Sequence, residues 1–157
     1  ILGELDGGFA VLMGELQRER LALAIGAVAG AEGMLAEAVA YVRERKAFGA
    51  PLAALQNTRF KLAEAATDIR VHRAFVDECR GLFMAGELDV ATVSMAKLAC
   101  TEMQGRVADT CLQLYGGYGY MREYGISRAY VDSRVQRIYG GTSEIMKELI
   151  SRSVLGK

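Results

Sequence analysis

Three long stretches of the chain repeat apolar residues at alternating intervals of four and three. This spacing places the repeated side chains on one face of an α-helix, where they form a seam that packs against another helix. The first seam comprises Leu21, Ile25, Val28, Glu32, Leu35, Val39 and Val42 and is apolar except at Glu32. The second comprises Leu62, Ala65, Ile69, His72, Val76, Cys79 and Phe83, and the third Val93, Ala96, Cys100, Met103, Val107, Thr110 and Leu114. Three such seams are typical of long helices packed antiparallel in a bundle.

Residues that begin or end helices fall between these seams. Pro51 is the only proline and can open the second helix. Gly86 is placed to end that helix and Asp89 to cap the next one, and the glycines at 116, 117 and 119 follow the third seam. The sequence predicts helices at about 8–45, 52–85, 89–115, 126–136 and 143–155, and no strand. The predicted fold class is all-α: an up-down antiparallel four-helix bundle with an additional short helix.

Composition excludes several classes of protein. The chain has 157 residues, 52% of them hydrophobic, and a formal net charge of zero, so we expect one packed domain that is neither disordered nor nucleic-acid-binding. No run of about 18 uninterrupted apolar residues occurs, so we expect no membrane span. The chain begins ILGELDGGF, without a methionine or signal peptide, and we interpret residues 1–157 as one domain of a longer protein.

Cysteine and histidine usage limits the possible chemistry. Cys79, Cys100 and Cys111 are odd in number and form no CxxC pair, so we expect small buried residues of a reducing compartment. His72 is the only histidine and lies on the second seam, so we expect a partly buried structural residue. Neither a histidine-based metal site nor a Ser-His triad is expected, and we predict no metal.

The stretch QRIYGGTSEIMKE, residues 136–148, is the clearest candidate ligand turn. Gly140 and Gly141 allow a ligand to approach the backbone closely and permit φ values that other residues avoid. The helix that starts after them directs free N–H groups at whatever lies there, which suits a phosphate, a carboxylate or a polarised carbonyl. Because Gly140 has no side chain, any proton-transfer group must come from elsewhere.

Three other segments leave alternatives open. The glycine-rich segment 115–120 resembles a dinucleotide fingerprint, but a helix rather than a strand is predicted before it, which favours a bend over a nucleotide site. The cationic run 43–49 is either a solvated helix end or a phosphate clamp. Glu19 lies between Arg18 and Arg20, which can stabilise its ionised form, and is either an exposed charge or a general base.

Taken together, three segments resemble the acyl-CoA dehydrogenase family, and its long-chain type most. They are QRERLALA (17–24), ERKAFGAPLAALQNTRFKLAE (44–64) and QLYGGYGYMREYGISRAYVDSRVQRIYGGTSEIMKELI (113–150). The resemblance covers nearly the whole chain and corresponds to the family's C-terminal helical domain, without its N-terminal helical and middle β domains. It implies FAD-dependent α,β-dehydrogenation of an acyl-CoA thioester to a trans-2-enoyl-CoA, with the hydride passing to flavin N5.

The resemblance also assigns roles to residues. Many members carry the base as a glutamate at the position of Gly140, whereas long-chain and isovaleryl-type members place it on the first helix before an arginine. Glu19 therefore matches the general base and Arg20 a residue that supports it. The N–H of Gly140 would bind the thioester carbonyl, and Gln17, Arg18, Arg20 and Gly141 would line the substrate.

Cofactor contacts and partners follow from the same resemblance. The residues implied to contact FAD are Arg45, Phe48, Gln56, Gln113, Leu114, Tyr115, Gly116, Gly117, Thr142, Ser143 and Glu144. Among them, Arg45 and residues 113–117 would serve the FAD of a neighbouring subunit, which implies a homodimer or homotetramer. Electron-transferring flavoprotein is the implied electron acceptor, and the bacterial cytoplasm or the mitochondrial matrix the implied compartment.

Two other functions remain open from the sequence. The domain alone could be a helical oligomerisation module without activity, or the protein could be an acyl-CoA oxidase-like flavoprotein that consumes oxygen. Chain-length preference is not fixed by this domain.

Overall fold

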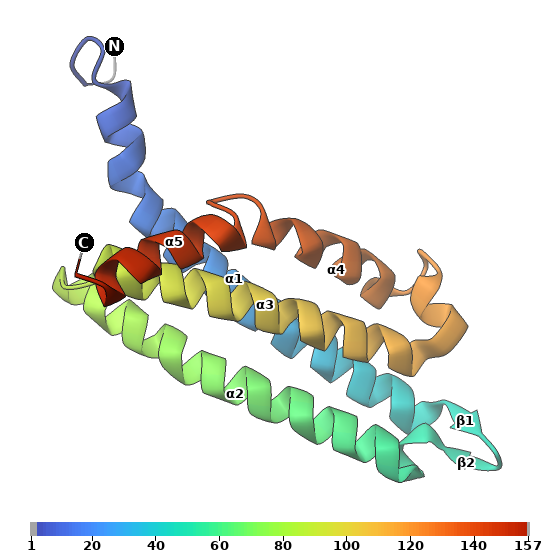
Figure 1. Ribbon diagram of the computed structural model, residues 1–157. Coiled ribbons are helices and arrows are strands. Elements are labelled where there is room, and N and C mark those ends of the chain that lie inside the picture. Colours follow the sequence, from blue (N-terminus) through green and yellow to red (C-terminus); the bar gives the residue numbers. More distant parts are fainter. Residues whose placement is uncertain (1–2, 157) are drawn as a thin grey trace.

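The computed structural model describes residues 3–156 and is an all-α bundle (Figure 1). Three long helices, α1 (Gly8–Glu44), α2 (Gln56–Ala85) and α3 (Val90–Tyr115), run up, down and up. The shorter α4 (Gly125–Arg134) and α5 (Ser143–Val154) both pack on α3, and α4 runs back along it. Short 3₁₀ segments cover Leu52–Ala54, Gly116–Tyr120 and Val135–Arg137. The predicted fold class is confirmed; residues 1, 2 and 157 of the predicted domain lie outside the described part.

The turn between α2 and α3 follows the sequence prediction. Gly86 adopts a left-handed φ of 74° and ends α2, with its amide N–H bonded to the carbonyls of Leu82 and Phe83. Asp89 then caps α3, because its carboxylate accepts a hydrogen bond of 2.9 Å from the amide N–H of Thr92. The two long helices are thus joined with few residues between them.

The connection between α1 and α2 differs from the prediction in two respects. The chain forms a small antiparallel hairpin from β1 (Lys46–Ala47) and β2 (Ala50–Pro51), although no strand was predicted. Phe48 and Gly49 make its tip with positive φ values of 53° and 81°. Pro51 does not open an α-helix; it precedes the 3₁₀ turn, and α2 begins at Gln56. Two-residue strands are too short to produce a periodic sequence signal.

The core lies where α1, α2 and α3 meet. The third predicted seam is correct from Val93 to Val107, where every member is buried. In α1, however, the buried face also includes Ala24, Ala27, Ala31, Met34 and Ala38, outside the predicted row. Small alanines allow α1 and α3 to approach closely, so the helix buries a wider face than a 4-3 seam describes. Phe83 of the second seam is 39% exposed, so that seam was predicted too long.

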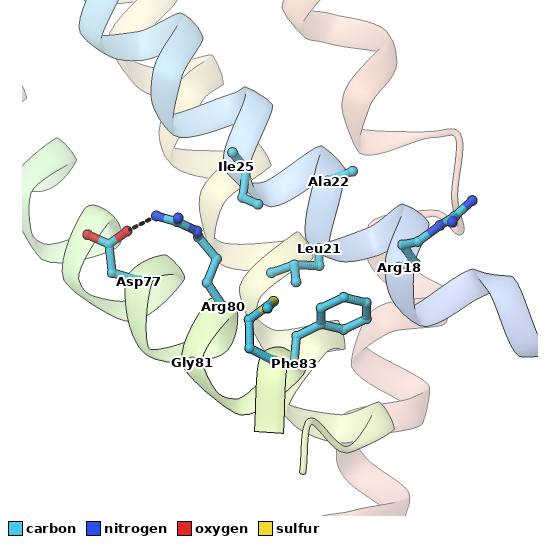
Figure 2. A pocket seen from close by; sticks show the side chains of 9 residues that line it. Arg18, Leu21, Ala22, Ile25, Asp77, Arg80, Gly81 and Phe83 are labelled. Atoms are coloured by element: carbon cyan, nitrogen blue, oxygen red, sulfur yellow. Dashed lines mark hydrogen bonds and ion pairs between the residues drawn. The ribbon is translucent and has the colours of Figure 1, made fainter. Parts of the chain in front are cut away.

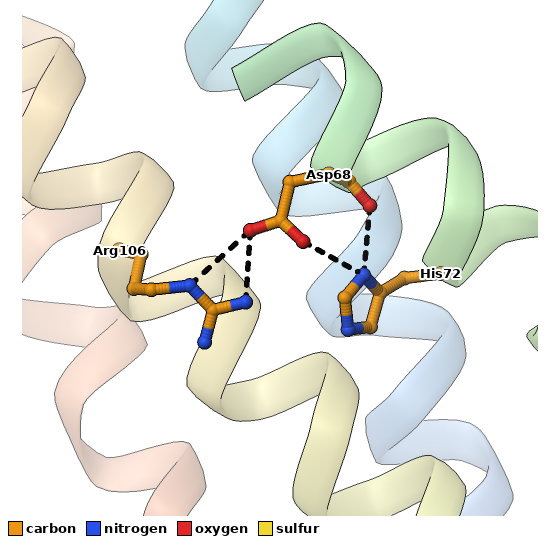
Figure 3. Close-up of polar contacts among 3 residues, drawn as sticks. All are labelled: Asp68, His72 and Arg106. Carbon is orange, nitrogen blue, oxygen red and sulfur yellow. Dashed lines mark hydrogen bonds and ion pairs between the residues drawn. The ribbon is translucent and has the colours of Figure 1, made fainter. Parts of the chain in front are cut away.

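Polar residues in the seams and next to them form ion pairs and hydrogen bonds between neighbouring helices. Glu32 lies at the edge of α1 and receives two hydrogen bonds, of 3.0 and 2.7 Å, from the guanidinium of Arg73 on α2. Figure 3 shows Asp68 of α2 between Arg106 of α3 and His72. The Oδ2 atom of Asp68 lies 2.8 Å from Nη2 of Arg106, and its Oδ1 atom lies 3.2 Å from Nδ1 of His72. The prediction of a partly buried structural histidine is confirmed.

The predicted burial of the three cysteines is also confirmed, since all of them are free and buried. Helix α1 is long and apolar enough, by length and composition alone, to cross a membrane. A core helix of a folded domain meets the same criterion, and the apolar face of α1 packs against α2 and α3. Of the most apolar 18-residue window of α1, 33% is buried inside the bundle.

Candidate active site

The Gly140–Gly141 turn lies between the last 3₁₀ segment and α5. Both glycines adopt positive φ, 65° and 107°, a conformation that a residue with a Cβ atom avoids. Thr142 caps α5, since its hydroxyl accepts a hydrogen bond of 3.3 Å from the amide N–H of Ile145. Within residues 3–156, the amide N–H of Gly140 has no backbone acceptor. The turn therefore presents a free donor.

Arg20 holds this turn from α1. Its side chain is buried, and its Nε atom donates to the carbonyl oxygen of Gly140 over 3.2 Å. Burial lowers the pKa of Arg20, and the neighbouring carboxylate of Glu19 opposes that shift. The predicted supporting arginine thus contacts the turn itself, 120 residues away in sequence.

Lys97 holds the same turn from α3. Its Nζ atom donates to the carbonyl oxygen of Gly141 over 2.6 Å, and its side chain is fully buried. Burial lowers the pKa of Lys97, and the like charge of Arg20 adds to that effect. Sequence reasoning missed this residue. The available signal was a single cation directly after the apolar seam residue Ala96 and four residues after Val93.

Glu19 is exposed on α1, beside this turn. Leu23, one helical turn further along the same face, lies so close to Gly140 that a Cβ atom there would be 2.6 Å from its Cδ1. Together with the contact of Arg20, this places the Glu19 face of α1 at the Gly140 turn. Gln17 is half-buried in the preceding turn of the helix.

Arg18 does not join this group. Its Nε atom lies 3.0 Å from a carboxylate oxygen of Glu15, and both side chains are largely exposed. Figure 2 shows Arg18 instead at the rim of a cavity of about 600 Å³ between α1 and the end of α2. That cavity is lined mainly by apolar side chains, among them Leu21, Ile25, Phe83 and Met84. It could take an apolar ligand on the face of α1 next to the one that carries Glu19.

A polar network fixes the start of α5. The hydroxyl of the buried Ser143 donates to Oε1 of Glu102 over 2.8 Å. Arg137 lies 3.3 Å from the other oxygen of Glu102 and packs over Gly105, where a Cβ atom would collide with its guanidinium. The family resemblance implies that Ser143 contacts the cofactor; in this structure its hydroxyl donates a hydrogen bond to Glu102 on α3. Glu144 is exposed at the N-terminus of α5, where backbone N–H groups lower the pKa of its carboxylate.

A second group of predicted residues gathers at the other end of α3. Arg45 and residues Gln113–Gly117 line one cavity of about 650 Å³ together with Tyr41, Leu52, Tyr118 and Met121. Tyr41 stacks on Tyr115 with ring centroids 3.9 Å apart, and Arg45 lies over the ring of Tyr118 at 5.2 Å. Arg45 of the cationic run and the glycine segment therefore line one cavity, and the family resemblance had grouped these same residues.

The remaining predicted cofactor contacts lie apart from this cavity. Phe48 is 96% exposed at the hairpin tip, and Gln56 is exposed at the first residue of α2. Thr142 and Ser143 belong to the Gly140 turn. Lys97 and Tyr115 are 18 residues apart on α3, about 27 Å along the helix axis. The predicted contacts therefore form two separate groups on one chain.

Comparison with known proteins decides the family. Residues 6–155 match the family model described as "Acyl-CoA dehydrogenase, C-terminal domain". The chain belongs to the acyl-CoA dehydrogenase family. It is 54% identical over 155 residues to the long-chain specific acyl-CoA dehydrogenase of Rattus norvegicus, covering 99% of this chain and 36% of that one. It is 38% identical to the acryloyl-CoA reductase (NADH) of Anaerotignum propionicum, covering 99% of this chain and 39% of that protein.

Solved structures agree with this assignment. An acyl-CoA dehydrogenase from Geobacillus kaustophilus superposes with a TM-score of 0.93 at 49% identity, over 98% of this chain and 40% of that one. The chain thus spans between a third and a half of the length of these relatives. The family resemblance inferred from the motifs is confirmed, including its correspondence to the C-terminal domain.

Proposed function

We propose that this domain belongs to an FAD-dependent enzyme that converts an acyl-CoA thioester into a trans-2-enoyl-CoA, with Glu19 as the general base. The observation that carries the proposal is the meeting of the Glu19 face of α1 with the Gly140–Gly141 turn, through Arg20 and Leu23. A base and a carbonyl-binding N–H are thereby brought to one place. These are the two groups that abstraction of a proton α to a thioester requires.

Glu19 removes the proton from the α-carbon. Glu19 is exposed in this domain and directly precedes the buried Arg20 on α1. Because Arg20 donates a hydrogen bond to the carbonyl of Gly140, it connects the helical segment that carries Glu19 with the turn. Residue 140 is glycine and offers no carboxylate to the same α-carbon, so Glu19 is the base that we propose for this site.

The N–H of Gly140 stabilises the charge that develops on the thioester oxygen. Its lack of a backbone acceptor within the described residues leaves it available for that bond. One such donor contributes about 3 kcal/mol to transition-state stabilisation in comparable sites. Glycine keeps the donor while leaving out the side chain that would compete with Glu19 for the α-carbon.

The chemistry of the residues present fits an FAD. Arg45 and the glycine turn at 116–117 offer a cation and an open backbone, and a Cβ atom at either glycine would meet nothing within 4 Å. This combination suits a diphosphate. Thr142 and the start of α5 would hold another part of a flavin nucleotide. Leu114 and Tyr115 would contact it from the Arg45 cavity, and Phe48 and Gln56 from the hairpin tip and the start of α2. When bound, the flavin supplies the acceptor for the hydride that leaves the β-carbon.

The assembly is proposed to be a homodimer or homotetramer. The two groups of cofactor residues are separated by about 27 Å along α3. That separation supports the idea that Arg45 and Gln113–Gly117 bind the FAD of a neighbouring subunit, whereas the Gly140 turn serves its own. Substrate contacts by Gln17, Arg18 and Gly141 belong to the same proposal.

Electrons are proposed to pass to an electron-transferring flavoprotein. The compartment is proposed to be the mitochondrial matrix or the bacterial cytoplasm, since the relatives include a rat protein named mitochondrial and a bacterial acyl-CoA dehydrogenase. Oxygen uptake without another acceptor would instead indicate an oxidase. The other alternative is a helical domain that serves only for assembly. Flavin reduction by acyl-CoA in the full-length enzyme would exclude it.

The test compares two neighbouring glutamates in the full-length enzyme. Glu19→Gln should abolish the loss of flavin absorbance on adding acyl-CoA while FAD stays bound. Glu15→Gln is the matched control, because Glu15 lies one helical turn earlier, is exposed, and contacts Arg18 rather than the turn. Undiminished flavin reduction in Glu19→Gln would rule out Glu19 as the base. No reduction by any acyl-CoA in the wild type would leave only a structural role.

A further inference from the structure

Lys97 is a charged residue in a place where charge is costly. It is among the largest fully buried side chains of the domain, and its buried neighbours on α3 include the apolar Val93 as well as the polar Ser94 and Thr101. Within residues 3–156 no carboxylate lies within ion-pair distance of it, and the carbonyl of Gly141 is its one hydrogen-bond acceptor. The carboxylates of Glu102 and Glu144 act on Lys97 from further away and partly oppose the lowering of its pKa. A buried ammonium without a direct counter-charge still destabilises a fold. A purely apolar residue would pack there at lower cost, so the charge calls for another explanation.

Lys97 contacts the Gly140–Gly141 turn, whose conformation has to be restrained by side chains from other parts of the domain. Two successive glycines have the widest range of backbone conformations of any dipeptide and lose the most entropy on ordering. Upstream, the amide groups of Ile138 and Tyr139 are fixed by hydrogen bonds to the carbonyl of Val135. Downstream, Thr142 is fixed as the helix cap. Between them, only Arg20 and Lys97 restrain the described backbone, one at each glycine carbonyl.

We propose that Lys97 is a positioning residue for the reaction. By donating to the carbonyl of Gly141 from inside the bundle, it fixes the turn so that the N–H of Gly140 points at the thioester carbonyl. This inference rests on the proposed function of that N–H. Lys97 acts through the turn and does not touch the substrate.

The geometry explains why a cation serves better than a neutral donor. Arg20 and Lys97 hold consecutive carbonyls from two different helices, α1 and α3. A charged donor makes the shorter and stronger hydrogen bond, as its 2.6 Å length indicates. Restraint at both carbonyls fixes the peptide planes that follow Gly140, while the bonds at 138 and 139 fix the chain before it. The N–H of Gly140 is therefore held from both sides and left without a partner of its own.

The experiment uses the full-length holoenzyme and three variants. Lys97→Met keeps the length of the side chain but removes the donor. Lys97→Arg restores a cationic donor. Thr101→Val is the matched control: Thr101 is buried one turn further along α3, and its hydroxyl bonds only to carbonyls of its own helix, that of Lys97 at 2.9 Å included. Because buried ions can often be replaced by apolar residues of similar size, Lys97→Met is expected to fold and retain FAD. If it does not, Lys97→Leu replaces it, since leucine also lacks a donor.

We expect kcat of Lys97→Met to fall about ten- to a hundredfold, less than the loss of a whole oxyanion donor, with KM changed less than about threefold. Amide hydrogen exchange in the peptide covering residues 138–146 should become faster than in the wild type. Lys97→Arg should recover part of kcat, and Thr101→Val should match the wild type in both measurements.

Wild-type kcat in Lys97→Met, or an equal loss in Thr101→Val, would overturn the inference. Unchanged hydrogen exchange at 138–146 would do so as well. Glu19→Gln separates this from the proposed function, since it should abolish turnover and leave exchange in the turn unchanged. If Glu19→Gln kept its activity while Lys97→Met lost it, the assignment of the base would fail and the role of Lys97 would stand.

Discussion

At position 140, both the backbone conformation and the neighbouring side chain favour glycine over any residue with a Cβ atom. Its φ of 65° favours glycine, and the methyl group of Leu23 fills the space in front of it. Leu23 lies four residues after Glu19 on the same face of α1. The helix that carries the proposed base thus also fills the volume that a base on the turn would need.

This contact predicts how well the base can be moved. In the full-length Glu19→Gln enzyme, Gly140→Glu should restore a fraction of turnover. That activity should stay at least about tenfold below wild type, because a left-handed backbone costs a non-glycine residue about 1–2 kcal/mol. Adding Leu23→Ala should raise it several-fold by making room, as steady-state kcat would show. Leu23→Ala with Glu19→Gln alone is the control and should stay inactive; equal activity with and without Leu23→Ala would contradict the steric argument.

The buried cysteines give a second prediction at this scale. Burial raises the pKa of Cys100 to about 12 and that of Cys111 to about 11. Both are therefore thiols at pH 8 and should resist iodoacetamide in the folded protein but react after unfolding, as mass spectrometry would show. Because the folded state holds these protons more tightly, their contribution to stability is complete below about pH 9 and is lost as pH rises further. Rapid alkylation of the native protein would contradict this.

Among the three long helices, the buried face of α3 was the most predictable from sequence and that of α1 the least. The large apolar residues of α3 mark its buried face directly, whereas the alanines of α1 fit any face of a helix. The hairpin at 46–51 was missed because two-residue strands have no period. Lys97 was missed because the predicted seam of α3 includes Ala96 and Cys100 on either side of it but not Lys97 itself. Glu19 and Arg45 look like exposed charges in the sequence. The hydrogen bond of Arg20, next to Glu19, with Gly140 and the cavity that Arg45 shares with Gln113–Gly117 become visible only in the structure.

The cap of α3 allows a test of element stability. Asp89→Ala should lower the free energy of unfolding by about 1 kcal/mol at pH 7, because the amide of Thr92 loses its acceptor. Hydrogen bonds from Thr92 lower the pKa of Asp89, so its stabilisation is present above about pH 4 and is lost as pH falls through the folded-state pKa. Denaturant unfolding should therefore show a larger difference at pH 7 than at pH 3. Glu87→Ala, exposed two residues earlier, should match the wild type at both.

At the scale of the molecule, the domain has two separate groups of residues that we propose to bind the cofactor. One is the Gly140 turn with Arg20 and Lys97, and the other is the cavity of Arg45 and residues 113–117 at the far end of α3. Both are open to solvent in this chain. The first turns of α1 also expose Phe9, Leu12 and Met13, which is typical of a surface that packs against other parts of a protein.

The isolated domain should accordingly bind FAD weakly. Fluorescence titration of residues 1–157 with FAD should give a dissociation constant far above that of the full-length enzyme, and the purified domain should be colourless. The full-length protein expressed in parallel is the control. Stoichiometric yellow domain after gel filtration would contradict the division of the site between chain segments and subunits.

The most direct test of the central claim follows the α-proton itself. An acyl-CoA analogue with sulfur at C3 cannot give up a hydride there, so exchange of its C2 hydrogens with heavy water reports proton abstraction alone. In the full-length enzyme, wild type and Glu15→Gln should catalyse this exchange, and Glu19→Gln should reduce it by about a hundredfold or more. Exchange at the wild-type rate in Glu19→Gln would show that another group removes the proton.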